Sequence, residues 1–270
     1  MINPVVFKLG PLELHAFTAW IIAGVSVGIA LILIIAARRK ERINAWLDVI
    51  MAAVIGGVIG ARAVHVWLNW AYFAAHADQI AVYSSGGLDW HGAVGLGLLF
   101  AIIAAVVRHV PLKPLTDAFA LAFPIGAMAV WLACAASASA YGVEVRTLAD
   151  FPSWLVIESP DVYGTIAPRL NLPPIGIVLA MILLLVVMTL TALRHFEGLR
   201  LWLTLALYAL SMAFMDFFRA DYVATWFGRR GDQILDLAVA LIAILIFCIV
   251  GLTRRREIVH VIYRRVEQGE

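Results

Sequence analysis

Long apolar runs separated by short polar connections dominate the hydrophobic pattern of this 270-residue chain. A helix needs about 20 apolar residues to cross the hydrocarbon core of a bilayer. Seven runs are candidates for such helices: Phe17–Ala37, Leu47–Leu68, Trp90–Val107, Leu115–Ala140, Pro174–Leu193, Leu201–Phe218 and Ile234–Leu252. The pattern therefore predicts an all-α integral membrane protein, with seven transmembrane helices in one bundle.

The composition supports this class. Hydrophobic residues make up 63% of the chain and charged residues 14%, whereas a soluble domain is roughly half apolar and about a quarter charged. We expect residues 1–270 to form a single polytopic membrane domain. Cys134 and Cys248 each lie inside an apolar run, so we expect neither a disulfide nor a metal site. We also expect no cofactor and no nucleic-acid partner.

The positions of lysine and arginine predict the orientation, because cytoplasmic loops of membrane proteins carry an excess of both. Thirteen lie after the first, third, fifth and seventh runs, and six lie on the other side. This bias places the N-terminus outside and the C-terminus in the cytoplasm. The external loops are then about residues 69–89 and 141–173, and residues 253–270 form a basic cytoplasmic tail.

The segment from Ser84 to Gly97 is the first candidate site. Gly86 and Gly87 form a flexible turn, and His91 and Gly92 follow where the chain enters the third apolar run. Glycines allow close backbone approach, and an ionisable residue at the mouth of a membrane segment is a functional candidate by default. The alternative is an interfacial histidine that packs and bonds locally.

Arg62 is the one basic residue inside a predicted span, and small residues surround it at Gly56, Gly57 and Gly60. A guanidinium group binds phosphate or carboxylate oxygens in pairs, so Arg62 is a candidate ligand for a lipid headgroup. The alternative is an arginine whose side chain extends along the helix to the interface.

The end of the sixth run is the third candidate region. Tyr208, Met212 and Asp216 recur at helical spacing on one face, and Asp216 and Arg219 are spaced to pair. This pattern is typical both of a site and of an ion pair that ends a membrane span. Gln233, at the start of the last run, is expected to face the bundle or the headgroups.

Taken together, these motifs resemble the bacterial prolipoprotein diacylglyceryl transferase family. The similarity lies in five segments of the chain: Phe7–His15, Gly60–Arg62, Gly86–Gly92, Tyr208 with Asp216–Arg219, and Gly231–Leu235. The resemblance implies a seven-helix protein of the bacterial inner membrane that binds phospholipid, with phosphatidylglycerol expected, in an outward-facing cavity. The family transfers a diacylglyceryl group from this lipid to the lipobox cysteine of a prolipoprotein. The resemblance also implies catalytic roles for His91 and Tyr208. The headgroup contacts that it implies are Arg62, Arg219, Gly86, Gly87, Gly92 and Gln233.

The fourth predicted segment departs from the family signature. Trp131 stands where the signature arginine belongs, Cys134 at the first asparagine and Ser139 at the glutamate. Met212 replaces a further family arginine in the sixth segment. Because positive groups aimed at developing charge are usually the largest catalytic term, these changes predict little family activity.

Two hypotheses follow from the resemblance and the departures. In the first, this is a non-catalytic relative that binds phospholipid or serves with other subunits in a membrane complex. In the second, it is an active transferase, in which His91 or Tyr208 assists deprotonation of the thiol.

Overall fold

The computed structural model describes residues 4–9, 12–83, 87–161 and 163–267, and over these residues the protein is a helical bundle. Seven of the described helices are 16 residues or longer. They are α1 (Ala16–Arg38), α2 (Ile43–Leu68), α4 (Trp90–Arg108), α5 (Leu112–Ala136), α6 (Leu172–Ala192), α7 (Arg200–Met215) and α8 (Gly231–Glu267). Six contain a stretch long and apolar enough to cross a membrane, and α7, with 16 residues, is shorter. This confirms the predicted all-α membrane bundle.

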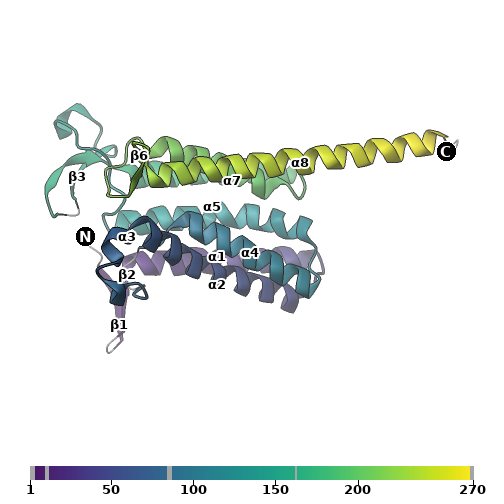
Figure 1. The fold of residues 1–270 in the computed structure, drawn as a ribbon, viewed down its shortest axis with the longest axis horizontal. Coiled ribbons are helices and arrows are strands. Elements are labelled where there is room, and N and C mark those ends of the chain that lie inside the picture. The colour runs from purple at the N-terminus through teal and green to yellow at the C-terminus, as the bar shows by residue number, and fades with distance from the viewer. Residues whose placement is uncertain (1–3, 10–11, 84–86, 162, 268–270) are drawn as a thin grey trace.

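The helices pack in pairs that are not always consecutive in sequence. The most extensive contacts join α2 to α4, α1 to α5 and α7 to α8, with α5 also packed on α6 (Figure 1). One apolar cluster lies between the first four long helices, around Trp46, Ile50 and Leu115. A second forms around Trp131, Tyr208 and Met212, which brings α5, α6 and α7 together. The bundle thus has an apolar interior as well as an apolar surface.

Short elements gather at one end of the bundle, which we call the hairpin end (Figure 1). Three antiparallel hairpins lie there: β1 (Val5–Leu9) with β2 (Leu12–His15), β3 (Val156–Pro160) with β4 (Ile166–Leu170), and β5 (Thr225–Trp226) with β6 (Arg229–Arg230). The short helix α3 (Trp70–Phe73) and the 3-10 turns Ala77–Gln79 and Leu148–Asp150 belong to the connections at the same end. The two loops that we predict to be external therefore have local structure of their own.

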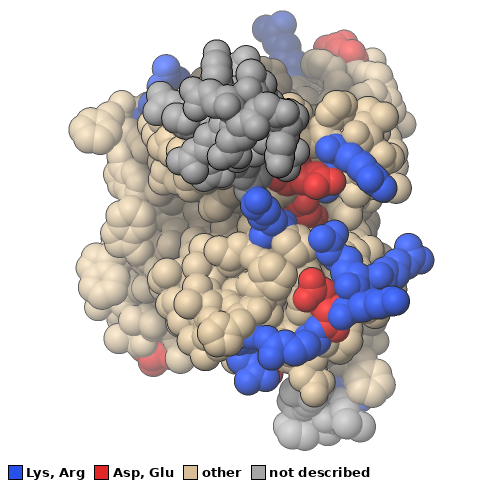
Figure 2. Space-filling model, turned by 90° about the vertical axis from the view of Figure 1, so that its right-hand side faces the viewer, with Lys and Arg blue, Asp and Glu red and all other residues tan. Residues whose placement is uncertain are grey.

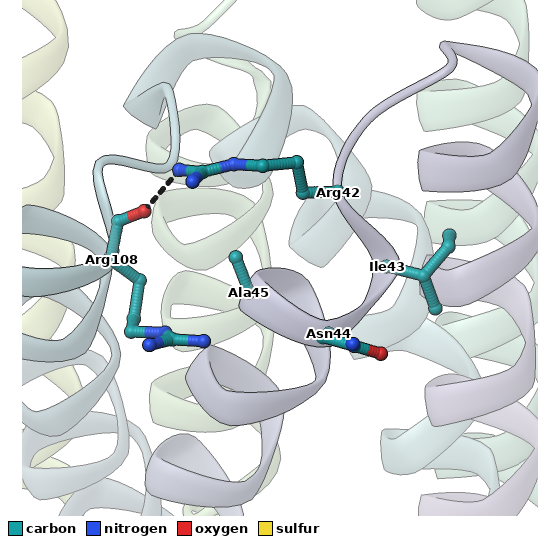
Figure 3. A pocket seen from close by; sticks show the side chains of 5 residues that line it. All are labelled: Arg42, Ile43, Asn44, Ala45 and Arg108. Atoms are coloured by element: carbon teal, nitrogen blue, oxygen red, sulfur yellow. Dashed lines mark hydrogen bonds between the residues drawn. The ribbon is translucent and has the colours of Figure 1, made fainter.

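The opposite end of the bundle is rich in basic side chains (Figure 2). Exposed lysines and arginines lie there in the connections between α1 and α2, α4 and α5, and α6 and α7. A hollow of about 510 Å³ opens at this end beside Arg42, Ala45 and Arg108. Its two arginines are already engaged, since Arg42 Nη2 donates to the Arg108 carbonyl at 2.6 Å (Figure 3) and Arg108 Nε pairs with Asp48 at 2.7 Å. This end is the one that the distribution of charge predicts to be cytoplasmic.

Most helix boundaries differ from the predictions by a few residues, and among the C-terminal ends those of the fourth and seventh segments differ most. The fourth segment was expected to continue to Ala140, but α5 ends at Ala136. Ala138 and Ala140 adopt the left-handed conformation, with φ of 49° and 54°, which a right-handed helix cannot contain. The seventh segment was expected to end at Leu252, but α8 continues as a helix to Glu267 and projects beyond the bundle (Figure 1).

Close packing of α2 on α4 depends on glycine. A Cβ atom added to Gly92 would collide with the backbone carbonyl of Gly60, and one added to Gly60 would collide with that of Gly92. Small residues allow membrane helices to approach in this way. Gly92, predicted to contact a headgroup, is buried in this seam.

We expect Gly92→Ala to lower the free energy of unfolding of the purified protein by about 1–3 kcal/mol, because the added methyl group overpacks the α2–α4 seam. Gly95→Ala is the matched control on the same helix, since a Cβ at Gly95 meets nothing within 4 Å. Thermal unfolding in detergent measures both variants. Equal stability of the two would contradict the packing role of Gly92.

Candidate functional site

The site around His91 begins with the cap of α4. Asp89 precedes the helix, and its carboxylate accepts the backbone N–H groups of His91 at 2.9 Å and Gly92 at 3.2 Å. A carboxylate is a favoured cap because it satisfies donors that the helix leaves unpaired. Asp89 also donates its own N–H to the Ala61 carbonyl of α2 at 3.0 Å. The cap therefore fixes both the start of α4 and its distance from α2.

Both ring nitrogens of His91 face carboxylates. Nδ1 lies 3.0 Å from Asp89 Oδ1, and Nε2 lies 2.7 Å from Asp236 Oδ1 on α8. The side chain of His91 is 6% exposed and that of Asp236 only 2%. A doubly protonated imidazolium donates from both nitrogens, which satisfies both carboxylates at once. In that state His91 has no lone pair to accept a further proton.

Arg219 lies in a carboxylate cluster beyond the end of α7. It binds Asp221 through two bonds, Nη2 to Oδ2 at 2.6 Å and Nε to Oδ1 at 3.0 Å. Its Nη1 is 3.2 Å from Asp216 and 3.3 Å from Asp232. Burial acts to lower the pKa of Arg219, but Asp221, Asp216 and Asp232 outweigh it and raise the pKa well above its usual value. Arg219 thus remains a cation, as the predicted Asp216–Arg219 pairing requires.

Arg230 closes the same cluster from the β5–β6 hairpin. Its guanidinium group binds Asp232 at 2.8 and 3.1 Å and donates to the Asp221 carbonyl at 2.8 Å. Because Arg219 and Arg230 share Asp221 and Asp232, these contacts connect the β5–β6 hairpin to the end of α7 and to the start of α8. Paired arginines and carboxylates with several shared partners form a rigid network rather than isolated surface ion pairs.

Arg62 holds the loop between α2 and α4. Its Nε, Nη1 and Nη2 atoms donate to the backbone carbonyls of Ile80 at 2.8 Å, Gly87 at 3.0 Å and Gln79 at 2.7 Å. The guanidinium group also lies over the rings of Phe73 and Tyr83. Arg62 is 4% exposed, so in this structure it serves as a clamp on the loop.

Gly87 is suited to this clamp by its backbone conformation. Its φ of 72° is in the left-handed region, and a Cβ there would lie 2.7 Å from Arg62 Nη1 and 2.6 Å from His65 Nε2. Gly87 therefore contributes a carbonyl to Arg62 at a place where a side chain does not fit. Gly86, predicted with it as a headgroup contact, lies outside the described residues.

Tyr208 lies in an aromatic and apolar cluster. Its ring makes edge-to-face contacts with Trp90 and Phe123, at centroid distances of 5.2 and 5.1 Å. Trp131 and Met212, which lie where the resemblance leads us to expect arginines, are buried in the same cluster. Gly176 on α6 faces the Trp131 indole so closely that any Cβ there would collide with the ring. The indole is thus packed into space that α6 leaves open.

Gln233 is satisfied within the protein. Its Nε2 donates to the Ala213 carbonyl of α7 at 2.9 Å, and the residue is 6% exposed. This places it toward the bundle, one of the two directions predicted. The bond joins α8 to α7 beside the carboxylate cluster, since Gln233 directly follows Asp232.

The structure brings most of the predicted residues to the hairpin end but divides them among three settings. His91 and Arg219 belong to charged groups that meet where Asp236 contacts Asp216, Arg62 and Gly87 belong to the loop clamp, and Tyr208 belongs to the apolar cluster. Sequence reasoning missed Asp236 as the partner of His91. The signal was present, since an acidic residue inside an apolar span is a functional candidate by default. Among the described residues, no group of three or more His, Cys, Asp or Glu side chains could hold a metal ion.

These features define a class: a polytopic helical membrane protein with a buried charged network at one end. Comparison with known proteins identifies the family within this class. The family model for prolipoprotein diacylglyceryl transferase matches residues 4–249. The chain therefore belongs to the prolipoprotein diacylglyceryl transferase family.

Individual relatives match over shorter stretches. Proteins named phosphatidylglycerol–prolipoprotein diacylglyceryl transferase are similar in Trichormus variabilis, at 31% identity over 46% of this chain and 44% of the relative, and in Bacillus licheniformis, at 31% over 46% of each. The protein of that name in Streptococcus equi subsp. zooepidemicus is 33% identical over 38% of this chain and 40% of its own length. The matches thus span less than half the length of these relatives.

Proposed function

We propose that this protein binds phospholipid at the hairpin end of the bundle without transferring a diacylglyceryl group. The observation that carries the proposal is the setting of Trp131 and Met212. The resemblance expects arginines at these two positions, and here both side chains pack with Tyr208 in a buried apolar cluster. An indole and a thioether cannot neutralise an anion, since neither carries positive charge.

The chemistry of the family explains why these positions matter. Transfer of the diacylglyceryl group expels a glycerol phosphate anion, so positive groups must stabilise the developing charge. Removing one such group typically costs on the order of a hundredfold or more in rate. Two replacements in one apolar cluster leave that cluster without either cation that the resemblance leads us to expect.

The remaining cations at this end are engaged by protein groups. Arg62 donates to three loop carbonyls, and Arg219 contacts three carboxylates. His91 is held between Asp89 and Asp236, which disfavours a role as the base that deprotonates a thiol. These contacts support a site that keeps its charges in place while a lipid binds beside them.

The second candidate function is the transfer reaction itself. The match of the family model to residues 4–249 favours it, as do the names of the relatives, which specify phosphatidylglycerol as the lipid. In that case His91 or Tyr208 would assist thiol deprotonation. Under either function we propose phosphatidylglycerol as the lipid, an external hairpin end, a cytoplasmic C-terminus and other membrane-protein subunits as further partners.

Complementation distinguishes the two functions. We expect that this chain, expressed in a bacterial strain depleted of its own transferase, does not restore growth, because Trp131 and Met212 cannot supply the two expected cations. Immunoblotting of the membrane fraction must show that the chain is present. Growth that is restored by this chain and lost again on His91→Ala would establish the transfer activity. Retention of phosphatidylglycerol over phosphatidylcholine by the purified protein, measured by native mass spectrometry, tests the binding half of the proposal.

A further inference from the structure

Two buried carboxyl groups meet where α7 ends against α8. The side chain of Asp216 is 1% exposed and that of Asp236 is 2% exposed. The two carboxyl groups lie within hydrogen-bonding reach of each other. Neither the loop clamp nor the apolar cluster accounts for this contact between two acids.

One carboxyl oxygen of this pair lacks a hydrogen-bond partner. Asp216 Oδ1 accepts from Arg219 at 3.2 Å, and Asp236 Oδ1 lies 2.7 Å from His91 Nε2. Asp216 Oδ2 is buried and has no hydrogen-bond partner among the described residues. Two carboxylates that share a site cannot both ionise without strong repulsion. A proton between them removes the repulsion and gives the open oxygen a partner.

The charged groups around Asp216 and Asp236 also favour a bound proton. Five carboxyl groups and three cationic groups form two ion-paired sets, which the contact of Asp216 with Asp236 joins. Tyr208 and Cys134 are further titratable side chains close to them. The cluster comprises Asp89 and His91 of the α4 cap, Asp216, Arg219 and Asp221 after α7, Arg230 of the hairpin, and Asp232 and Asp236 of α8. With His91 counted as a cation, the carboxylates still exceed the cations by two. Burying unbalanced charge is costly, so binding of a proton stabilises the cluster.

We propose that Asp216 and Asp236 bind a single proton between them, which makes the contact of α7 with α8 a proton-binding site. The bound proton joins the two helices and leaves Asp236 Oδ1 to accept from His91. A metal ion is the less suitable occupant, because no group of three His, Cys, Asp or Glu side chains in the described part of the chain could hold one. The proposal does not depend on whether the protein transfers a diacylglyceryl group.

The site makes the hairpin end sensitive to pH. When the proton leaves at alkaline pH, Asp216 and Asp236 repel each other across the helix contact. Arg219 pairs with Asp216 and His91 pairs with Asp236, and these pairings offset part of the repulsion. We therefore expect deprotonation to loosen the packing of α7 on α8 rather than to unfold the whole bundle.

Infrared spectroscopy of the full chain in lipid nanodiscs tests the proposal directly. At neutral pH we expect the carbonyl stretch of a buried protonated carboxyl group, shifted in D2O. The band should be lost in both Asp216→Asn and Asp236→Asn. Asp48→Asn is the control, since Asp48 is half exposed and paired with Arg108; it should change only carboxylate bands.

A pH titration of the wild-type chain keeps the test independent of how the variants fold. The band should disappear as the pH rises while the helical amide signal is retained. A wild-type spectrum without the band at neutral pH would overturn the proposal, as would a band that persists in both asparagine variants. Loss of the band on adding sodium at constant pH would also overturn it, by assigning the site to a cation.

Discussion

Replacing Arg62 with alanine is expected to destabilise the protein by about 3–5 kcal/mol, because bonds to charged groups contribute roughly 1.5–3 kcal/mol each. The substitution removes three donors from the carbonyls of Gln79, Ile80 and Gly87, together with the contacts to the Phe73 and Tyr83 rings. Exposure of the carbonyls to water offsets part of the loss, which is why the estimate is lower than the sum of the bonds.

The effect should be concentrated in the loop between α2 and α4. Hydrogen exchange of the backbone amides of residues 77–89 should become faster, while exchange in α1 and α5 stays unchanged. Arg62→Lys should recover only part of the stability, since an ammonium group cannot reproduce the planar fork. Arg146→Ala, at an exposed arginine of the other predicted external loop, is the control. Unchanged exchange in residues 77–89 of Arg62→Ala would contradict the clamp.

Much of the fold could be predicted from the sequence because membrane helices are long and strongly apolar. Each of the seven predicted runs overlaps one long helix of the structure. The boundary after α5 could not be predicted, since Ala138 and Ala140 are apolar residues in a conformation that alanine rarely adopts. The β3–β4 hairpin escaped prediction for a related reason, because its strands are short and interrupted by proline.

The candidate site was predictable residue by residue but not as an arrangement. Local patterns identified His91, Arg62 and the pairing of Asp216 with Arg219. The partner of His91 is Asp236, which lies 145 positions away along the chain. No local periodicity relates two such positions, and only the packing of α8 beside α4 brings them together. The same holds for Trp131, whose indole fits only because Gly176 faces it from another helix.

Replacing Arg219 with glutamine is expected to cost about 3–5 kcal/mol, the usual effect of removing one partner from a buried ionic network. The side chain is 23% exposed and contacts Asp216, Asp221 and Asp232. Glutamine keeps most of the side-chain volume but carries no charge, so three carboxylates lose a shared cation. Arg230 contacts two of them and limits the loss.

The direction of the pH dependence separates this electrostatic effect from a packing defect. Protonation of the carboxylates relieves their repulsion, so the deficit of Arg219→Gln relative to wild type should shrink as the pH is lowered. Thermal unfolding at a series of pH values measures it. Arg229→Gln is the control in the same hairpin, since Arg229 is exposed and contacts the Phe217 ring rather than a carboxylate. A deficit of constant size across the series would show that Arg219 acts through its packing, because lost van der Waals contacts do not respond to protonation.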